Sequence, residues 1–293
     1  MVTITTPTGK IGAGVLRELL ARDVSPLRVL VRDRRTLPAV EQDRLAIVEG
    51  DLRRPDTLRR AFDGATALFW CQPDCPDAVD YVGAYEELAI SARDAIRACG
   101  VSRVVAISAA GLPGDRPAGP ITALHRMESR LGESGAACRF LRCGSFYENL
   151  LWQWDSISTQ GVFSYCMPGD RPGPQLATAD IATVAARLLA TPGWDDRQAI
   201  PLLGPEDLSY NDMAAELTRE LGRPVRYEAM PPGAYADLLV SMGQSEDAAR
   251  GLVNMFEYLA HGYQTDAAAD RSLTPTTLAQ WIRLHAAGRP VNP

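Results

Sequence analysis

Residues 6–12 read TPTGKIG and decide the fold, because they connect a short β-type run, Val2–Thr5, to an amphipathic helical run over residues 12–21. Gly9 and Gly12 hold the second and third positions of a G-x-x-G-x-x-G pattern, and Thr6 holds the first. Such a turn lets the backbone approach a pyrophosphate at the positive end of a helix. An ordinary β–α connection is the alternative. We predict a dinucleotide site that includes Thr6, Thr8, Gly9, Lys10, Ile11 and Gly12.

Strand-like and helix-like runs alternate through the first 150 residues. Further apolar strand-like runs occupy residues 28–31, 46–48, 67–70, 104–107 and 140–141. Helical runs lie between them at residues 58–62, 85–99 and 121–131. Because parallel strands need crossover helices on both faces, this order predicts an α/β fold, a Rossmann-type doubly wound parallel sheet.

The pattern loosens after residue 150. A turn-forming stretch at residues 168–174 precedes a helix at 180–189 and a short strand at 200–203. The rest is expected to be largely helical, over residues 210–221, 233–242, 245–260 and 276–287, with breaks at residues 231–232 and 262. We predict a core over residues 1–150 and a mostly helical substrate cap over residues 151–293, with the chain returning to the core around residues 175–205.

Composition restricts the class of protein. The net charge of −6 argues against a nucleic-acid surface and against binding to an acidic membrane. The six cysteines and three histidines show no metal-ligand spacing, so no metal site is expected. Without a signal peptide or a long apolar stretch, the chain is expected to be cytoplasmic with reduced thiols. It is expected to act on a small molecule, as a monomer or a dimer.

The end of the second strand-like run bears on the choice of cofactor. NAD enzymes place an acid there against the ribose, and NADP enzymes an arginine near the 2′-phosphate. Arg32 holds this position, with Arg34 and Arg35 close by, and a guanidinium group suits phosphate. Asp33 as an acid for NAD is the alternative. The arginines favour NADP(H).

Several short motifs, in order, carry a family resemblance. Besides the turn, they lie at residues 31–33, 50–52, 107–111, 125–128, 134–142, 146–149, 178–182 and 203–209. With them the chain resembles the NmrA-like branch of the atypical short-chain dehydrogenase/reductases. The resemblance implies that Asp51 and Leu52 flank the adenine. It places the following residues along the cofactor: Cys71, Gln72, Ser108, Cys143, Gly144, Ser145 and Phe146.

The proton donor of ordinary short-chain reductases is missing from the sequence. Those enzymes use a Tyr-x-x-x-Lys pair, whereas Lys10 is the only lysine here and no tyrosine has Lys or Arg four residues on. His125, Tyr147 and Ser108 are the candidates for a catalytic group. Three explanations stay open: a substrate that needs little acid help or supplies its own proton, another side chain as the acid, or no reaction at all.

Large apolar groups in the second half favour an aromatic substrate. The predicted contacts are Tyr147, Asn149, Trp152, Met242, Met255 and Phe256, although part of this set has ordinary core spacing. The chain is also similar to ketoreductases of aromatic polyketide (angucyclinone) biosynthesis. This implies an NADPH-dependent ketoreductase acting on a ketone or quinone of a polycyclic compound made in antibiotic biosynthesis. The alternative is a catalytically inactive NADP(H)-binding redox sensor.

Overall fold

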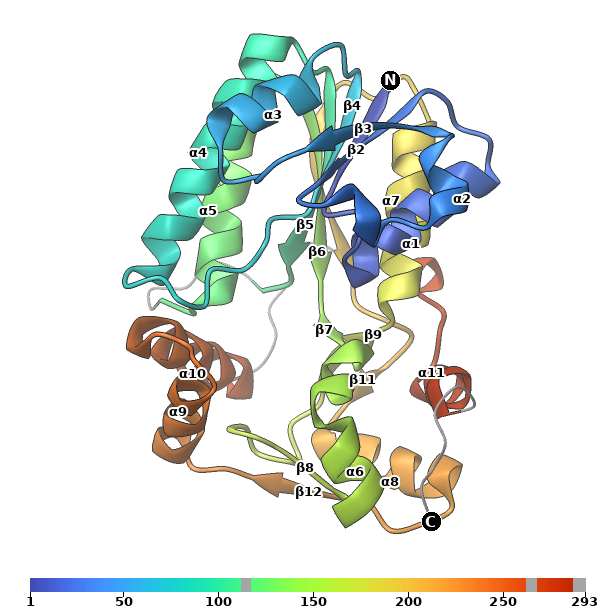
Figure 1. Cartoon of the computed structure of the whole chain (residues 1–293). Helices are drawn as coiled ribbons and strands as arrows, with labels where there is room; N and C mark the ends of the chain where they lie inside the picture. The colour runs from blue at the N-terminus through green and yellow to red at the C-terminus, as the bar shows by residue number, and fades with distance from the viewer. Residues whose placement is uncertain (112–116, 262–267, 287–293) are drawn as a thin grey trace.

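A parallel sheet forms the centre of the molecule. The computed structural model describes residues 1–111, 117–261 and 268–286. Within these ranges seven parallel strands pair in the order β10-β6-β5-β4-β1-β2-β3, which reverses between β4 and β1 (Figure 1). This arrangement confirms the predicted Rossmann-type fold. The strands are β1 Val2–Thr5, β2 Leu27–Val31, β3 Leu45–Glu49, β4 Ala67–Trp70, β5 Arg103–Ala109, β6 Ala137–Cys143 and β10 Arg197–Leu202.

Helices cover both faces of this sheet. On one face α3 Pro55–Phe62, α4 Tyr81–Cys99 and α5 Pro120–Gly132 pack side by side (Figure 1). On the other face α1 Lys10–Ala21 packs against α7 Thr178–Ala190, near the short η1 Arg34–Thr36 and α2 Ala39–Gln42. A Cβ added at Gly14 would lie 2.7 Å from the Cβ of Ala182, so a glycine permits this close helix contact.

The chain leaves the core after β6 and later returns to it. Helix α7 packs on α1, and β10 pairs with β6 from Arg197 opposite Cys138 to Leu202 opposite Cys143. This returning segment separates the two stretches that make up most of the lower half in Figure 1. The exact division of the chain near residue 150 stays a prediction.

The elements outside the core lie at the carboxyl ends of the strands (Figure 1). They are β7 Ser145–Phe146, η2 Tyr147–Gln153, α6 Trp154–Gln160, β8 Val162–Tyr165, β9 Gly173–Leu176, β11 Asp207–Leu208, α8 Tyr210–Leu221, β12 Arg226–Ala229, α9 Pro232–Ser241, α10 Glu246–Ala260, η3 Arg271–Leu273 and α11 Leu278–Ala286. We call them the cap. Its core is aromatic: Tyr210 stacks on Tyr165 at 4.9 Å and on Tyr227 at 4.8 Å between ring centroids.

Several cap elements differ from the expectation. Strand β12 interrupts the part expected to be largely helical, because it pairs in parallel with β8, a partner about 60 residues earlier that local periodicity does not reveal. The end of the predicted turn stretch enters strand β9. The expected break at residue 262 and the last residue of the final predicted helix, 287, lie outside the described ranges. Among the described helices, none is long and apolar enough to cross a membrane.

Candidate functional site

The turn after β1 is tight although its first position is not a glycine. Thr6 adopts a left-handed conformation with φ of 48°, and its carbonyl accepts a hydrogen bond from the Gly9 N–H at 3.0 Å. A Cβ at Gly12 would lie only 2.1 Å from the Thr6 carbonyl oxygen, whereas one at Gly9 would make an ordinary contact of 3.4 Å. Gly12 is therefore the glycine that closes helix α1 onto the turn.

The first turn of α1 is suited to bind an anion. The helix begins at Lys10, its N-cap Gly9 offers no side-chain cap, and the first turn contains no acidic residue. Unsatisfied N–H groups and the helix dipole give this end a positive potential. A pyrophosphate group is the anion that such a turn holds in dinucleotide-binding folds.

A cavity of about 400 Å³ opens beside this turn. The predicted residues that line it come from the turn, from the end of β2 and from the segment after β3: Thr6, Thr8, Gly9, Arg32, Asp51 and Leu52. The lining also includes residues that were not predicted as cofactor contacts, although several lie in the motifs described above: Pro7, Leu30, Val31, Gly50, Arg53, Pro73 and Asp74. All of these residues lie at or just after the carboxyl ends of β1 to β4. Their place at the end of a predicted strand is therefore the sequence signal that could have identified them.

The arginines after β2 have different surroundings. Arg35 forms an ion pair of 2.7 Å with Asp33, and its hydrogen bonds to that carboxylate lower the pKa of Asp33. Arg34 donates to the Gln42 side chain at 3.3 Å. Arg32 lines the cavity and makes no hydrogen bond or ion pair to any residue that the structure describes. Because Asp33 is engaged by Arg35, Arg32 is the better placed group for a ligand phosphate.

The ends of β4 and β6 carry predicted cofactor residues that are mostly buried. The Gln72 side chain donates to the Tyr85 carbonyl at 2.6 Å and accepts from the Trp70 indole at 3.3 Å. Burial raises the pKa of Cys71 to about 11 and raises that of Cys143 further. Gly144 donates to the Leu202 carbonyl at 2.9 Å, and the two residues after it form β7. The buried Ile11 packs in the core under the turn.

The catalytic candidate Ser108 is part of a buried polar network. The Ser108 hydroxyl, at the end of β5, donates to Glu128 Oε1 of α5 at 2.5 Å. Arg142 of β6, paired with Ser108 across the sheet, donates to both oxygens of Glu128 at 2.9 and 2.7 Å. Sequence reasoning missed the roles of Glu128 and Arg142, because only the strand register and helix packing bring them together. Ser108 is committed to this network.

The other two catalytic candidates lie on different elements. Tyr147 is fully buried in the cap, with its ring centroid 6.0 Å from that of Trp281. Burial, followed by the nearby carboxylate of Glu206, raises its pKa, so its hydroxyl stays protonated. His125 is half-buried on α5, three residues before Glu128. The described part of α5 contains no tyrosine or lysine.

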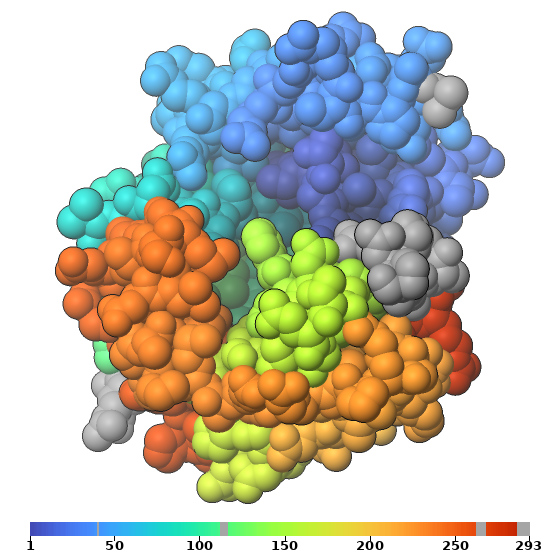
Figure 2. All heavy atoms as spheres, turned by 60° about the horizontal axis from the view of Figure 1, so that its bottom comes forward, coloured from blue at the N-terminus to red at the C-terminus, as the bar shows by residue number. Residues whose placement is uncertain are grey.

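The predicted substrate residues fall into exposed and buried groups. Trp152 of η2 is 78% exposed, and Met242 at the end of α9 is 65% exposed. Asn149 is also exposed, Met255 is half-buried, and Phe256 is buried in the aromatic core of the cap. Figure 2 shows the surface hollowed between the α9–α10 pair, in orange, and the segment around residues 150–160, in yellow-green. Trp152 belongs to η2 in the second segment, and Met242 is the C-cap of α9.

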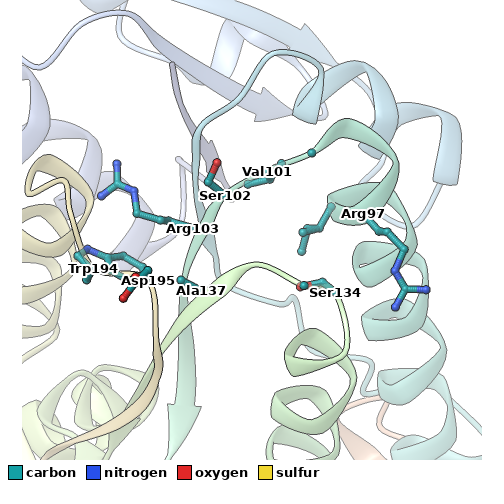
Figure 3. A pocket seen from close by; sticks show the side chains of 11 residues that line it. Arg97, Val101, Ser102, Arg103, Ser134, Ala137, Trp194 and Asp195 are labelled. Carbon is teal, nitrogen blue, oxygen red and sulfur yellow. The ribbon is translucent and has the colours of Figure 1, made fainter.

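A second cavity, of about 480 Å³, lies at the opposite edge of the sheet, where β5 and β6 begin. Arg97 and Arg103 line it, but their guanidinium groups point in opposite directions (Figure 3). Arg103 donates to the Thr191 carbonyl at 2.6 Å, and Arg97 donates to the Glu133 carbonyl. The two cations therefore do not converge on one ligand, and the carboxyl edge remains the candidate site.

Known proteins resemble the chain over most of its length. The sequence profile described as NAD(P)H-binding matches residues 7–192. NAD(P)H azoreductase of Xenophilus azovorans is 30% identical over 292 residues, which cover 98% of this chain and 98% of that protein. Quinone oxidoreductase 2 of Escherichia coli is 25% identical over 244 residues, 83% of this chain and 82% of the relative.

A solved structure shares the fold. The crystal structure of the NADPH-dependent quinone oxidoreductase of Escherichia coli, complexed with NADPH, matches with a TM-score of 0.79 and 22% identity, over 98% of this chain and 100% of that one. The predicted cofactor class and reaction class are thus supported together, and the chain is an NAD(P)H-dependent oxidoreductase. Its turn, its sheet order and its relatives show that it belongs to the NAD(P)H-binding family of NmrA-like, atypical short-chain dehydrogenase/reductases.

Proposed function

We propose that the protein uses NADPH to reduce a quinone-type carbonyl of a planar aromatic compound. In this proposal the turn from Thr6 to Gly12 holds the pyrophosphate, and Arg32 pairs with the 2′-phosphate. Asp51 and Leu52 flank the adenine, and the ends of β4 to β6 face the nicotinamide. The dihydronicotinamide supplies the hydride, and the protein positions the two reactants.

The hydrogen bond of the Ser108 hydroxyl is the observation that favours a quinone as the substrate. The hydroxyl donates to a carboxylate that Arg142 also holds, so its proton points to Glu128 and not toward a substrate oxygen. With Tyr147 buried among cap side chains, the described chain presents no Tyr-Lys pair at the strand ends. A quinone needs little acid help, because its ring delocalises the charge that hydride transfer creates.

A hydroxyl group next to the reacting carbonyl would further simplify the reaction. Such a group donates its proton to the developing oxyanion from within the substrate, so no protein acid is needed. A positioned general acid contributes about 10²- to 10⁴-fold to a rate, which is the size of the help that the substrate would have to replace. A polycyclic hydroxyquinone of the aromatic polyketide type fits this requirement and is the substrate that we propose.

The hollow between the α9–α10 pair and the segment around residues 150–160 suits a flat molecule. We propose that Trp152 and Met242 contact the aromatic rings from its two sides, with Asn149 and Met255 nearby. Exposed aromatic and thioether side chains bind planar rings well, since they offer polarisable surface at small loss of solvation.

The relatives favour two related acceptors. Quinone oxidoreductase 2 supports the quinone. The azoreductase, similar along 98% of both chains, favours an azo bond conjugated to aromatic rings as a second candidate. Both are electron-poor conjugated groups that a hydride reduces without an ordinary ketone's need for a strong acid.

The test is a panel of acceptors with NADPH in excess. We expect rapid NADPH oxidation and hydroquinone formation with a hydroxynaphthoquinone, and slow or no turnover with a simple aryl ketone. NADPH oxidation with an aromatic azo compound tests the second candidate acceptor. Ser108→Ala should keep kcat with the quinone within about threefold, because Ser108 is not the acid. Faster turnover of the aryl ketone than of every quinone, or a large loss of kcat in Ser108→Ala, would refute the proposal.

A further inference from the structure

Lys10 bridges the cofactor turn and the cap. Its Nζ donates to the backbone carbonyl oxygen of Glu148 at 3.2 Å, across 138 positions of sequence. The same ammonium lies 5.9 Å from the centre of the Trp152 ring, within the range of a cation–π interaction. Both contacts are made to η2, the segment that follows the predicted cofactor residues 143–146 and carries Trp152.

Segment η2 is fixed on its other side by the Glu148 carboxylate. Glu148 is buried, and its two oxygens accept hydrogen bonds from the Thr178 N–H at 3.2 and 3.1 Å. Oε1 also accepts from the Trp281 indole at 3.1 Å. A carboxylate at the N-terminus of α7 is favourable for the helix dipole. Glu148 therefore joins η2 to a core helix and to cap helix α11, while its carbonyl is held by Lys10.

The position of Lys10 is unfavourable for a lysine unless something compensates for it. It is the first residue of α1, where the helix dipole repels a cation, and the first turn contains no acid. The Glu148 carbonyl and the face of Trp152 supply the compensation on the cap side. Meanwhile Trp152 remains 78% exposed, so most of its ring is available to a ligand.

We propose that Lys10 is a positioning residue that holds η2 against the cofactor turn. We call this pair of contacts the latch, and we call η2, which carries the proposed acceptor contact Trp152, the acceptor wall. By holding the Glu148 carbonyl and the Trp152 ring, it sets the height and orientation of this wall relative to the dihydronicotinamide. The inference rests on the proposed function, since Trp152 is there a contact for the aromatic acceptor. It gives Lys10 a role in acceptor binding that is separate from any contact with the pyrophosphate.

The kinetic test compares Lys10→Met, Lys10→Arg and Trp152→Leu at saturating NADPH. We expect Lys10→Met to raise the KM for a naphthoquinone about tenfold, the loss of one charge-assisted hydrogen bond, with kcat within about twofold. Lys10→Arg should restore KM, because a guanidinium also donates to a carbonyl and stacks on an indole. Trp152→Leu should raise KM at least as much as Lys10→Met, because it also removes a proposed contact with the acceptor, and the effects in the double variant should be less than additive, because both changes remove the contact between Lys10 and Trp152.

Two controls separate the latch from a role in cofactor binding. The dissociation constant of NADPH without acceptor measures any contact of Lys10 with the pyrophosphate, and the latch predicts that the acceptor KM of Lys10→Met rises at saturating NADPH whatever the change in that constant. Arg17→Met removes another exposed cation from α1 and should change none of these constants. A tenfold weaker binding of NADPH in Lys10→Met with an unchanged acceptor KM would overturn the latch, and so would additive effects in the double variant.

A measurement without turnover keeps the latch testable if no quinone is reduced. Because Lys10 is the only lysine, protein labelled with [13C]lysine gives one lysine spin system in an NMR spectrum. The ring current of Trp152 should shift the ε-methylene resonance, and Trp152→Leu should move that resonance toward the value of free lysine, while Arg17→Met leaves it in place. An unchanged resonance in Trp152→Leu would contradict the latch; absence of quinone turnover with a shifted resonance would reject only the proposed substrate.

Discussion

The Ser108 hydroxyl donates a hydrogen bond of 2.5 Å to Oε1 of Glu128, and Arg142 closes on both oxygens of the same carboxylate. This network joins β5, α5 and β6 at the carboxyl edge of the sheet. It holds Ser108, one of the three candidates for a catalytic group. The Ser108 hydroxyl therefore belongs to this network, and under the proposed function the acceptor supplies the proton.

Breaking the network should destabilise the fold. In Glu128→Gln one side-chain oxygen is replaced by an NH₂ group, and the ion pair between Glu128 and Arg142, whose side chains are 8% and 14% exposed, is lost. We expect a loss of about 3 kcal/mol in the free energy of unfolding, as for other buried pairs broken on one side. Urea denaturation measures it. The control is Glu133→Gln at the exposed C-cap of α5. An equally small change in the free energy of unfolding for both variants would show that the network contributes no stability.

Arg32 should select the cofactor. If it pairs with the 2′-phosphate, Arg32→Ala should raise the KM for NADPH about 30-fold, or about 2 kcal/mol, and leave the KM for NADH nearly unchanged. Arg35→Ala is the matched control, because Arg35 is already paired with Asp33 at 2.7 Å. Steady-state rates with the two cofactors check the difference. An equal rise in the KM values for NADPH and NADH in Arg32→Ala would contradict the pairing of Arg32 with the 2′-phosphate.

Gly12 should be indispensable for the turn. An alanine Cβ would meet the backbone oxygen of Thr6 at 2.1 Å, so α1 has to move away from β1. We expect Gly12→Ala to cost about 3 kcal/mol of stability, the upper range for overpacking. Gly9→Ala meets the same oxygen at 3.4 Å and should cost far less. Thermal unfolding compares the two variants; similar melting temperatures would contradict the close approach of helix α1 to the turn.

Cys71 should be unreactive at neutral pH. Burial raises its pKa to about 11, so the folded protein holds the neutral thiol at pH 8 and forms thiolate only as the pH approaches 11. Cys99 is the internal comparison, because it is partly exposed as Cys71 is, while burial raises its pKa less. Iodoacetamide labelling followed by peptide mass spectrometry should modify Cys99 first at pH 8. Labelling of Cys71 at the same rate would show that its surroundings are open to solvent.

The sequence predicts the sheet and the turn because both depend on local order. Apolar runs alternate with helical runs, and two glycines follow the first strand, so β1, α1 and the cavity beside Arg32 follow from neighbouring residues. The left-handed Thr6 shows that a threonine can hold the first glycine position when the Gly9 N–H and the close Gly12 fix the turn.

What sequence reasoning missed depends on distant contacts. Glu128 and Arg142 meet only because β5 and β6 pair in one register. Met255 and Phe256 both fit the apolar pattern of their helix. Only the packing of the cap decides that the Phe256 ring is buried against Tyr165. Lys10 is predictable as part of the turn, but its contact with Glu148 spans 138 positions, and Trp152 lies further along the same segment.

The most direct test uses two acceptors that differ by one methyl group. One is a naphthoquinone with a hydroxyl group beside a carbonyl, and the other is its methyl ether, each reduced with NADPH under identical conditions. Our account predicts that masking the hydroxyl lowers kcat by a factor of about 100 or more, because the substrate loses the proton that no protein group replaces. Equal turnover of the two compounds would contradict it.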